Sequence, residues 1–269
     1  MRTLVVASII AMVCSSIISY AQNAVPRGSD GKPDLTGVWQ GGSNVRGSWD
    51  EANAGLGVGG SGRNPDTPSI PSSSERVTGR EAAPYQDWAA KKVLESYNKR
   101  GVDDPTSICL PPGVPRGVML GLFPQKIVQT PKEIVILYEY MNVFRTIPLN
   151  AQHPDDLLPS YMGDSVGHWE GDTLVVDVIG FNDKTWLAGT GTFHTEDLHV
   201  VERYTRVDKD QINYDVTMED PKVLTKPWTL HSTIMLREGT RLEEYICQEN
   251  NPTPADYEKL NKEGVKYSR

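Results

Sequence analysis

The side chains best suited to chemistry lie between Asp177 and His199, in a connector that joins two strand-like runs. His194, Glu196 and His199 form a His-x-Glu-x-x-His pattern there. It departs from the His-Glu-x-x-His pattern of zinc proteases, in which the histidines share one helical face. In a loop that leads into a strand, both imidazoles could converge on a substrate or a metal ion. The alternative is a loop whose histidines bond to the backbone, with Glu196 capping a turn.

Carboxylates on either side of this connector extend the candidate site. Residues 173–180 alternate as a strand, and Asp177 stands in an otherwise apolar row of that strand. Asp183 follows shortly after the strand. We predict a catalytic set at one mouth of the folded domain, consisting of Asp177, Asp183, His194, Glu196 and His199. The pattern assigns no metal ion to this set and leaves any cofactor unknown.

The strand that follows the connector must bury one charged side chain. His199 and Arg203 share one of its faces, whereas Glu202 and Tyr204 share the other. An unpaired charge inside a protein is costly, so the buried residue needs a partner.

Arg145 and Glu139 are the candidate partners. The pair would be a structural ion pair or, alternatively, a polar anchor for a ligand. Asp177 with Glu202 is a second candidate, as a pair of carboxylates for acid–base catalysis.

Three tryptophans in this half of the chain supply aromatic surface. In a barrel, such side chains line a ligand pocket or fill the core. We predict a ligand-binding set that consists of Trp169, Asn182, Trp186, Glu202 and Trp228. The alternative for each tryptophan is a place in the core or at a plugged barrel end.

The N-terminus has the pattern of a secretory signal peptide. Arg2 precedes an apolar run, Leu4 to Val13, that is too short to span a bilayer, and small residues lead to a cleavage site after Ala21. We therefore predict a periplasmic or secreted protein that has no membrane contact after cleavage. The chain is acidic, with a formal net charge of −8 and no basic stripe, which argues against nucleic-acid binding.

Cleavage would remove Cys14 and leave Cys109 and Cys247 as an even pair. In an oxidising compartment a disulfide between them is the default, and two separate buried thiols are the alternative.

Turn signals and alternating apolar residues predict a mainly β protein. About ten strands follow one another through tight turns, including a last hairpin from residues 228–236 into residues 241–247. Serial hairpins predict an antiparallel, up-and-down barrel. One internal helix, residues 84–101, carries Tyr85, Ala89 and Val93 on one face and should pack outside or across one end of the sheet.

The predicted organisation has six parts. They are a signal peptide (1–21), an N-terminal arm with the first strand (22–40), a flexible Gly/Ser/Pro-rich insertion (41–83), the helix (84–101), the barrel body (102–251) and a C-terminal tail (252–269). The first strand enters on Gly37-Val38-Trp39, a pattern typical of lipocalin-like barrels, in which the tryptophan closes one end.

Four motifs stand out as a set: Pro33–Trp39 (PDLTGVW), Cys109–Arg116 (CLPPGVPR), Trp169–Asp177 (WEGDTLVVD) and Gly180–Asp183 (GFND). Together they resemble a family of uncharacterised exported bacterial proteins. The resemblance implies export and a lipocalin-like β fold. It carries over no catalytic residue.

Three functions are compatible with these patterns. The first is an exported barrel that binds a small, largely apolar molecule. The alternative is a secreted hydrolase, lyase or isomerase with a His/carboxylate site at the barrel mouth. The third is a structural protein of the cell envelope. The sequence leaves the ligand and the oligomeric state open.

Overall fold

The computed structural model of the protein describes residues 24–41, 83–99, 102–119, 123–187 and 191–249, and a few residues between 255 and 263. The predicted signal peptide, nearly all of the Gly/Ser/Pro-rich insertion and most of the C-terminal tail lie outside the described residues.

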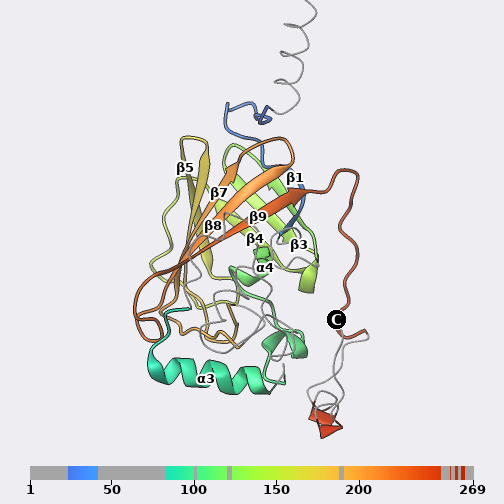
Figure 1. Ribbon diagram of the computed structural model, residues 1–269. Helices are drawn as coiled ribbons and strands as arrows, with labels where there is room; N and C mark the ends of the chain where they lie inside the picture. The colour runs from blue at the N-terminus through green and yellow to red at the C-terminus, as the bar shows by residue number, and fades with distance from the viewer. Residues whose placement is uncertain are drawn as a thin grey trace, which may run out of the picture.

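One antiparallel sheet dominates the described residues. It has nine strands in the order β4-β3-β2-β1-β9-β8-β7-β6-β5, curled into a nearly closed barrel (Figure 1). This confirms the predicted mainly β, antiparallel barrel. The strands are β1 (Gly37–Gly41), β2 (Gln125–Gln129), β3 (Glu133–Tyr138), β4 (Phe144–Pro148), β5 (Asp164–Glu170), β6 (Thr173–Ile179), β7 (His199–Arg206), β8 (Gln211–Glu219) and β9 (Trp228–Leu236).

Between β4 and β5 the barrel wall lacks a regular ladder of backbone hydrogen bonds, and this follows from its odd number of strands. Strands consecutive in the chain are antiparallel neighbours except β4 and β5, and β9 pairs with β1. A ring of nine strands cannot alternate in direction throughout, so one pair must run parallel. Within the described residues, the backbone link between β4 and β5 is one parallel bridge between Leu149, which directly follows β4, and Gly167, where Asn150 N donates to Gly167 O at 2.7 Å. The side chains of Arg145 and Ser165 also join the two strands. We call this junction of β4 and β5 the seam.

The seam also explains the long connection between β4 and β5. Parallel neighbours need a connection that returns along the length of the strand, whereas antiparallel neighbours need only a tight turn. Residues 149–163 make this return and are called the crossover loop below. The loop thereby lies beside the outer wall of the barrel rather than at one of its ends.

The barrel interior is filled by the protein's own side chains. A ligand cavity would leave the side chains around it accessible to water, whereas many apolar side chains on the inner face of the wall are between 0% and 1% exposed. They are Ile127, Ile134, Ile136, Ile147, Leu174, Val176, Val178, Val200, Ile212, Val216, Met218 and Ile234.

One end of the barrel is closed by Trp39, as the Gly-x-Trp pattern predicted. Its side chain is fully buried, and its Nε1 donates to Leu35 O at 2.8 Å. The guanidinium of Arg206 lies 5.1 Å from the Trp39 ring centroid, in cation–π contact, and also donates to the carbonyl of Asp34. The N-terminal arm thus lies across this end.

The opposite end is covered by helices and connectors. Helix α3 (Asp87–Asn98) lies across it (Figure 1), with Ala89 and Val93 fully buried. The predicted helix was expected to begin at Pro84. Instead Tyr85 forms a bridge with Leu224, which keeps residues 84–86 extended.

A buried segment seals this end beside the helix. The short helices η1 (Pro105–Ile108) and α4 (Arg116–Met119) flank the proline-rich run. Arg116 makes a two-point ion pair with Asp104, with distances of 2.8 and 2.7 Å. Cys109, at the end of η1, forms the predicted disulfide with Cys247.

The predicted last strand, residues 241–247, is wrong. These residues have no strand structure, because β9 already pairs with β8 on one side and β1 on the other. A second 3-10 helix, η2 (Tyr140–Asn142), lies near this segment, where Asn142 Nδ2 donates to Tyr245 O. Among the described residues, no helix has the length and apolar character needed to cross a membrane.

Candidate acid–base site on the outer wall

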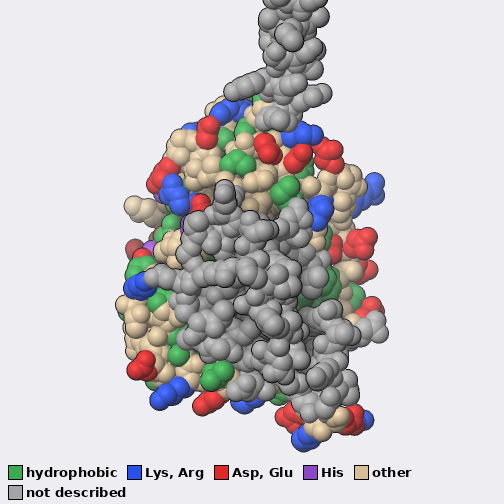
Figure 2. Space-filling view, in the orientation of Figure 1, with side chains coloured by type: hydrophobic (Ala, Val, Ile, Leu, Met, Phe, Trp, Pro, Cys, Tyr) green, Lys and Arg blue, Asp and Glu red, His purple; other side chains and the backbone are tan. Residues whose placement is uncertain are grey.

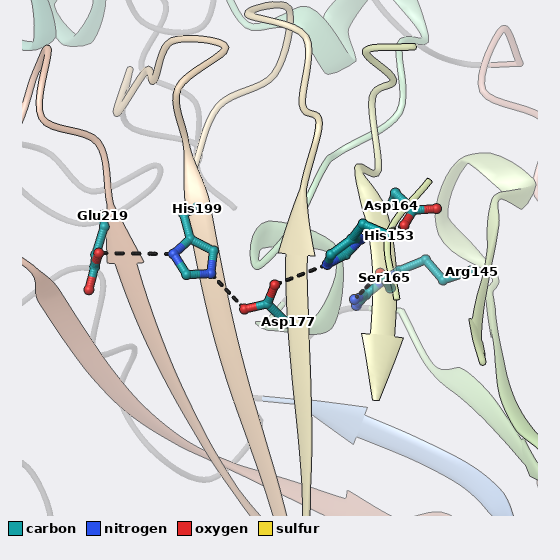
Figure 3. A network of polar contacts seen from close by, with 7 residues as sticks. All are labelled: Arg145, His153, Asp164, Ser165, Asp177, His199 and Glu219. Atoms are coloured by element: carbon teal, nitrogen blue, oxygen red, sulfur yellow. Dashed lines mark hydrogen bonds and ion pairs between the residues drawn. The ribbon is translucent and has the colours of Figure 1, made fainter. Parts of the chain in front are cut away.

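Five ionisable side chains form a continuous row on the outer wall of the barrel (Figure 3). We call this row the outer array. His153 Nδ1 lies 2.5 Å from Asp164 Oδ1, and His153 Nε2 lies 3.0 Å from Asp177 Oδ2. The other oxygen of Asp177 lies 2.6 Å from His199 Nε2. His199 Nδ1 then faces Glu219 Oε2 at 3.9 Å.

The strand register brings these residues together. Asp177 lies opposite Val201 on β7, and His199 lies opposite Glu219 on β8. Because side chains alternate between the two faces of a strand, Asp177, His199 and Glu219 all point outward near the same end of the wall. The crossover loop supplies His153.

The two oxygens of Asp177 are shared between two imidazoles. Partial burial acts to raise the pKa of Asp177, but the hydrogen bonds from His199 and His153 outweigh it and lower the pKa. Asp177 is therefore a carboxylate that accepts one N–H from each ring. His199 keeps its second nitrogen, Nδ1, beyond hydrogen-bond distance of the nearest carboxylate oxygen.

A second polar group, the inner cluster, lies inside the barrel behind the outer array. Arg145 Nη2 and Nη1 donate to the two oxygens of Glu202 at 2.5 and 3.1 Å. This is the structural ion pair expected for a buried Glu202, with Arg145 as the partner. The other candidate, Glu139, accepts from the backbone of Glu243, and Arg203 pairs with Glu170 on the outer surface.

Hydroxyl groups complete the inner cluster. Tyr204 and Tyr214 both donate to Glu202 Oε1, at 2.9 and 2.8 Å. Ser165 and Tyr138 contact the Arg145 guanidinium. Burial raises the pKa of Tyr138 to about 12. Although burial alone would lower the pKa of Arg145, the charge of Glu202 raises it well above its usual value.

The candidate acid–base pair of Asp177 with Glu202 is wrong. Val176 is the residue opposite Glu202, so Asp177 points to the other side of the wall. The two carboxylates belong to different networks. Those networks come closest along β5, where Asp164 contacts His153 outside and the next residue, Ser165, contacts Arg145 inside (Figure 3).

His194 does not join the outer array. It is 2% exposed, its Nδ1 donates to Thr195 O at 2.9 Å, and its Nε2 accepts from Thr185 Oγ1 at 2.7 Å. Burial lowers its pKa, although the Thr195 carbonyl and nearby carboxylates act to raise it. This matches the alternative in which a connector histidine bonds to the backbone.

The other two members of the predicted catalytic set are surface residues. Glu196 and Asp183 are both exposed, and in the described part of the chain neither forms a hydrogen bond or ion pair with Asp177 or His199. The fold therefore joins Asp177 to His199 and leaves Asp183, His194 and Glu196 apart from them. Loop residues have no fixed register, so spacing alone could not separate these groups.

The predicted ligand-binding residues do not meet in one place. Trp169 is half-buried near the β5–β6 turn, whereas Trp228 is buried at the start of β9, at the opposite end of the barrel. Glu202 is in the inner cluster. Trp186 is buried and forms a bridge with Phe193, and Asn182 Oδ1 accepts from Lys184 N in a turn.

Three members of the outer array were missed by the sequence analysis. His153 lies in a polar loop whose spacing contains no signal. Asp164 lies at the start of β5, which begins before the apolar alternation becomes visible. Glu219 could have been found, because a strand ending at residue 219 pairs in register with one beginning at His199.

Among the described residues, no three His, Cys, Asp or Glu side chains are arranged to hold one metal ion. The outer array is a row rather than a cage, because each imidazole faces a carboxylate on the next strand. Its available chemistry is proton transfer.

Comparison of the chain with models of protein families, with curated proteins and with solved structures finds no match.

Proposed function

We propose that the protein is an enzyme, a hydrolase, lyase or isomerase, that uses His199 as a general base on the outer wall of the barrel. The observation that carries the proposal is the hydrogen bond of 2.6 Å between Asp177 and His199 Nε2. This bond leaves His199 Nδ1 directed away from Asp177, with Glu219 as the nearest carboxylate at 3.9 Å.

This arrangement suits proton abstraction. A carboxylate that accepts the N–H of one ring nitrogen fixes the tautomer and orientation of the imidazole, and stabilises the imidazolium once a proton has been taken. Asp177 has this role, and His199 Nδ1 takes the proton. Hydrolysis, elimination and isomerisation all begin with such a transfer, from water or from a carbon acid.

The filled interior favours this function over a carrier of apolar molecules. A carrier needs space inside the barrel, whereas many inward-facing apolar side chains of this barrel are between 0% and 1% exposed. Figure 2 shows Lys and Arg interspersed with Asp and Glu over the described part of the visible face, which also gives no support to a polyanionic partner.

We further propose that the protein acts after export. The disulfide between Cys109 and Cys247 supports this, because such bonds form and persist in oxidising compartments. The signal-peptide pattern of the first residues is the second support.

The proposal is tested with the mature protein, His199→Gln and Asp177→Asn. Chromogenic esters, lactones and glycosides report hydrolysis, and deuterium uptake from heavy water into carbon acids reports elimination and isomerisation. We expect at least one turnover that falls on the order of 10²- to 10⁴-fold in His199→Gln.

His168→Gln is the matched control, because His168 also pairs with a carboxylate, Glu170, at 3.3 Å on the outer wall. It should retain full activity. A turnover that survives His199→Gln, or no turnover across the panel, would argue against the proposal.

A further inference from the structure

The gap between His199 and Glu219 has the width of one bridging water molecule. Glu219 Oε2 lies 3.9 Å from His199 Nδ1, which is too far for a direct hydrogen bond. A water oxygen at about 2.8 Å from each atom would donate to both at an angle of about 90°, near the angle between its own two O–H bonds. The gap therefore suits a water molecule that donates one hydrogen bond to each acceptor.

The backbone holds these two side chains next to each other. His199 on β7 is the register partner of Glu219 on β8, so both point outward at the same level of the wall. Directly after Glu219, the buried carboxylate of Asp220 accepts from the backbone N–H groups of Thr195 and Lys222, at 2.6 and 3.1 Å. These bonds tie the end of β8 to the connector that leads into β7.

The gap is open to solvent. The side chains of His199 and Glu219 are 37% and 50% exposed, and Glu219 lies on the side of His199 that faces away from Asp177 (Figure 3). In the described part of the chain, no Ser, Thr or Cys side chain forms a hydrogen bond with His199. The proton donor at His199 Nδ1 is therefore a molecule that enters from solvent rather than a nucleophile of the protein.

We infer that the reaction is a hydrolysis in which His199 and Glu219 together hold the attacking water, which makes Glu219 a catalytic residue. This rests on the proposed function, in which His199 Nδ1 takes the proton. Because both O–H groups of the water point at the protein, the lone pairs of its oxygen are directed toward the substrate. A carbon acid has no second polar hydrogen at the reacting atom, so elimination or isomerisation would leave Glu219 without a role.

The substrate class is a neutral carboxylic ester or lactone, because the carboxylates of Asp177 and Glu219 disfavour an anion such as a phosphate ester. The water oxygen forms a bond to the carbonyl carbon while its proton passes to His199 Nδ1. The bond from that carbon to the leaving oxygen then breaks, and the leaving oxygen takes the proton from His199. Water and ester thus give a carboxylic acid and an alcohol, and the imidazole returns to its neutral form.

The experiment measures ester and lactone hydrolysis by the wild-type protein, Glu219→Leu and Glu219→Gln. In Glu219→Leu the water keeps one of its two acceptors, so kcat should fall by about 10- to 10²-fold with KM nearly unchanged. Glu219→Gln retains an acceptor oxygen and should recover part of this loss. Glu170→Leu is the matched control and should retain full activity, because Glu170 lies beside another histidine, His168, on the same wall.

A crystal structure tests the water site without a substrate. We expect a water within about 3.2 Å of both His199 Nδ1 and Glu219 Oε2 in the wild-type protein, and its loss in Glu219→Leu. A water bound to only one of the two atoms would overturn the inference. So would a burst of alcohol release in the first turnover, because a burst indicates a covalent acyl-enzyme.

The inference and the proposed function fail in different ways. Turnover confined to carbon acids, or ester hydrolysis that keeps its full kcat in Glu219→Leu, would remove the role of Glu219 and leave His199 as a general base. No turnover on any substrate would remove the proposed function, and this inference with it. If Glu219 has only a structural role, Glu219→Leu will lower the urea midpoint of unfolding and leave kcat unchanged.

Discussion

Arg145 and Glu202 form a two-point ion pair across the barrel interior, although their strands, β4 and β7, are not neighbours in the sheet. Their side chains are 2% and 0% exposed. Removing two charges from water is expensive, and their attraction offsets this cost only while both are present. The pair thus specifies how β4 sits against the β5–β9 half of the wall.

Removing one partner should be more damaging than removing both. Glu202→Leu leaves Arg145 buried without its counter-charge, so we expect a loss of about 3–5 kcal/mol in the free energy of unfolding. The double variant Arg145→Met/Glu202→Leu should be less destabilised than this. Urea unfolding measures both. Arg203→Met, at the exposed pair with Glu170, is the control and should cost less than about 1 kcal/mol. Additive losses in the double variant would contradict the argument.

The disulfide should contribute strongly to stability. It links residues separated by 138 positions, and the loop-entropy model gives about 4–5 kcal/mol for a closure of this length. We expect Cys109→Ser/Cys247→Ser to unfold at a clearly lower urea concentration than the oxidised protein. The wild type under reducing conditions should approach the variant. Equal midpoints with and without reductant would show that the bond contributes little.

The buried His194 should make stability depend on pH in mild acid. Burial lowers its pKa in the folded state, so the unfolded chain binds the proton more readily. The contribution of this group is therefore complete above about pH 6.5, the usual histidine value, and is lost as the pH falls below it. The free energy of unfolding should be smaller at about pH 5.5 than at about pH 7.5.

His194→Gln tests that assignment. It should flatten the dependence on pH over this window, whereas His231→Gln should keep it, because His231 lies at the surface beside Asp215. A wild-type slope that persists in His194→Gln would assign the effect to another group.

Gly41 allows helix α4 (Arg116–Met119) to pack closely against the end of the barrel. A Cβ atom at this position would lie 2.3 Å from the carbonyl oxygen of Val118, which is backbone and cannot turn aside. We expect Gly41→Ala to cost about 1–3 kcal/mol by forcing α4 outward. Gly117→Ala, whose nearest contact is Pro112 at 3.3 Å, should cost less. Thermal unfolding compares the two, and equal losses would argue against the steric explanation.

Alternation along the strands predicted much of the inner cluster. It placed Glu202 and His199 on opposite faces of one strand, and Arg145 was one of the two candidate partners, with Glu139, for the buried charge. Side chains on a strand have a period of two, so one correct strand assignment fixes the direction of every side chain on it.

The outer array was predicted only in part, for a physical reason that concerns His153. His153 enters through the crossover loop, which exists because an odd number of strands makes β4 and β5 run parallel. Whether the number of strands is odd or even is a property of the whole chain, and the sequence pattern predicts about ten strands rather than nine. The strand predicted at residues 241–247 contributed to this wrong count. It does not form, because β9 pairs with β1 and β8 and has no free edge.

The barrel wall should separate at the seam, between β4 and β5, before it separates elsewhere. Elsewhere, breaking the wall requires a full ladder of hydrogen bonds to separate, whereas along the seam it requires the loss of one bridge and a few side-chain contacts. Thermal fluctuations therefore separate β4 from β5 first, and backbone amides on those two edges exchange with deuterated solvent sooner than the amides of β7 and β8. Water then reaches Arg145 and Glu202 from the side, through the wall rather than through either end.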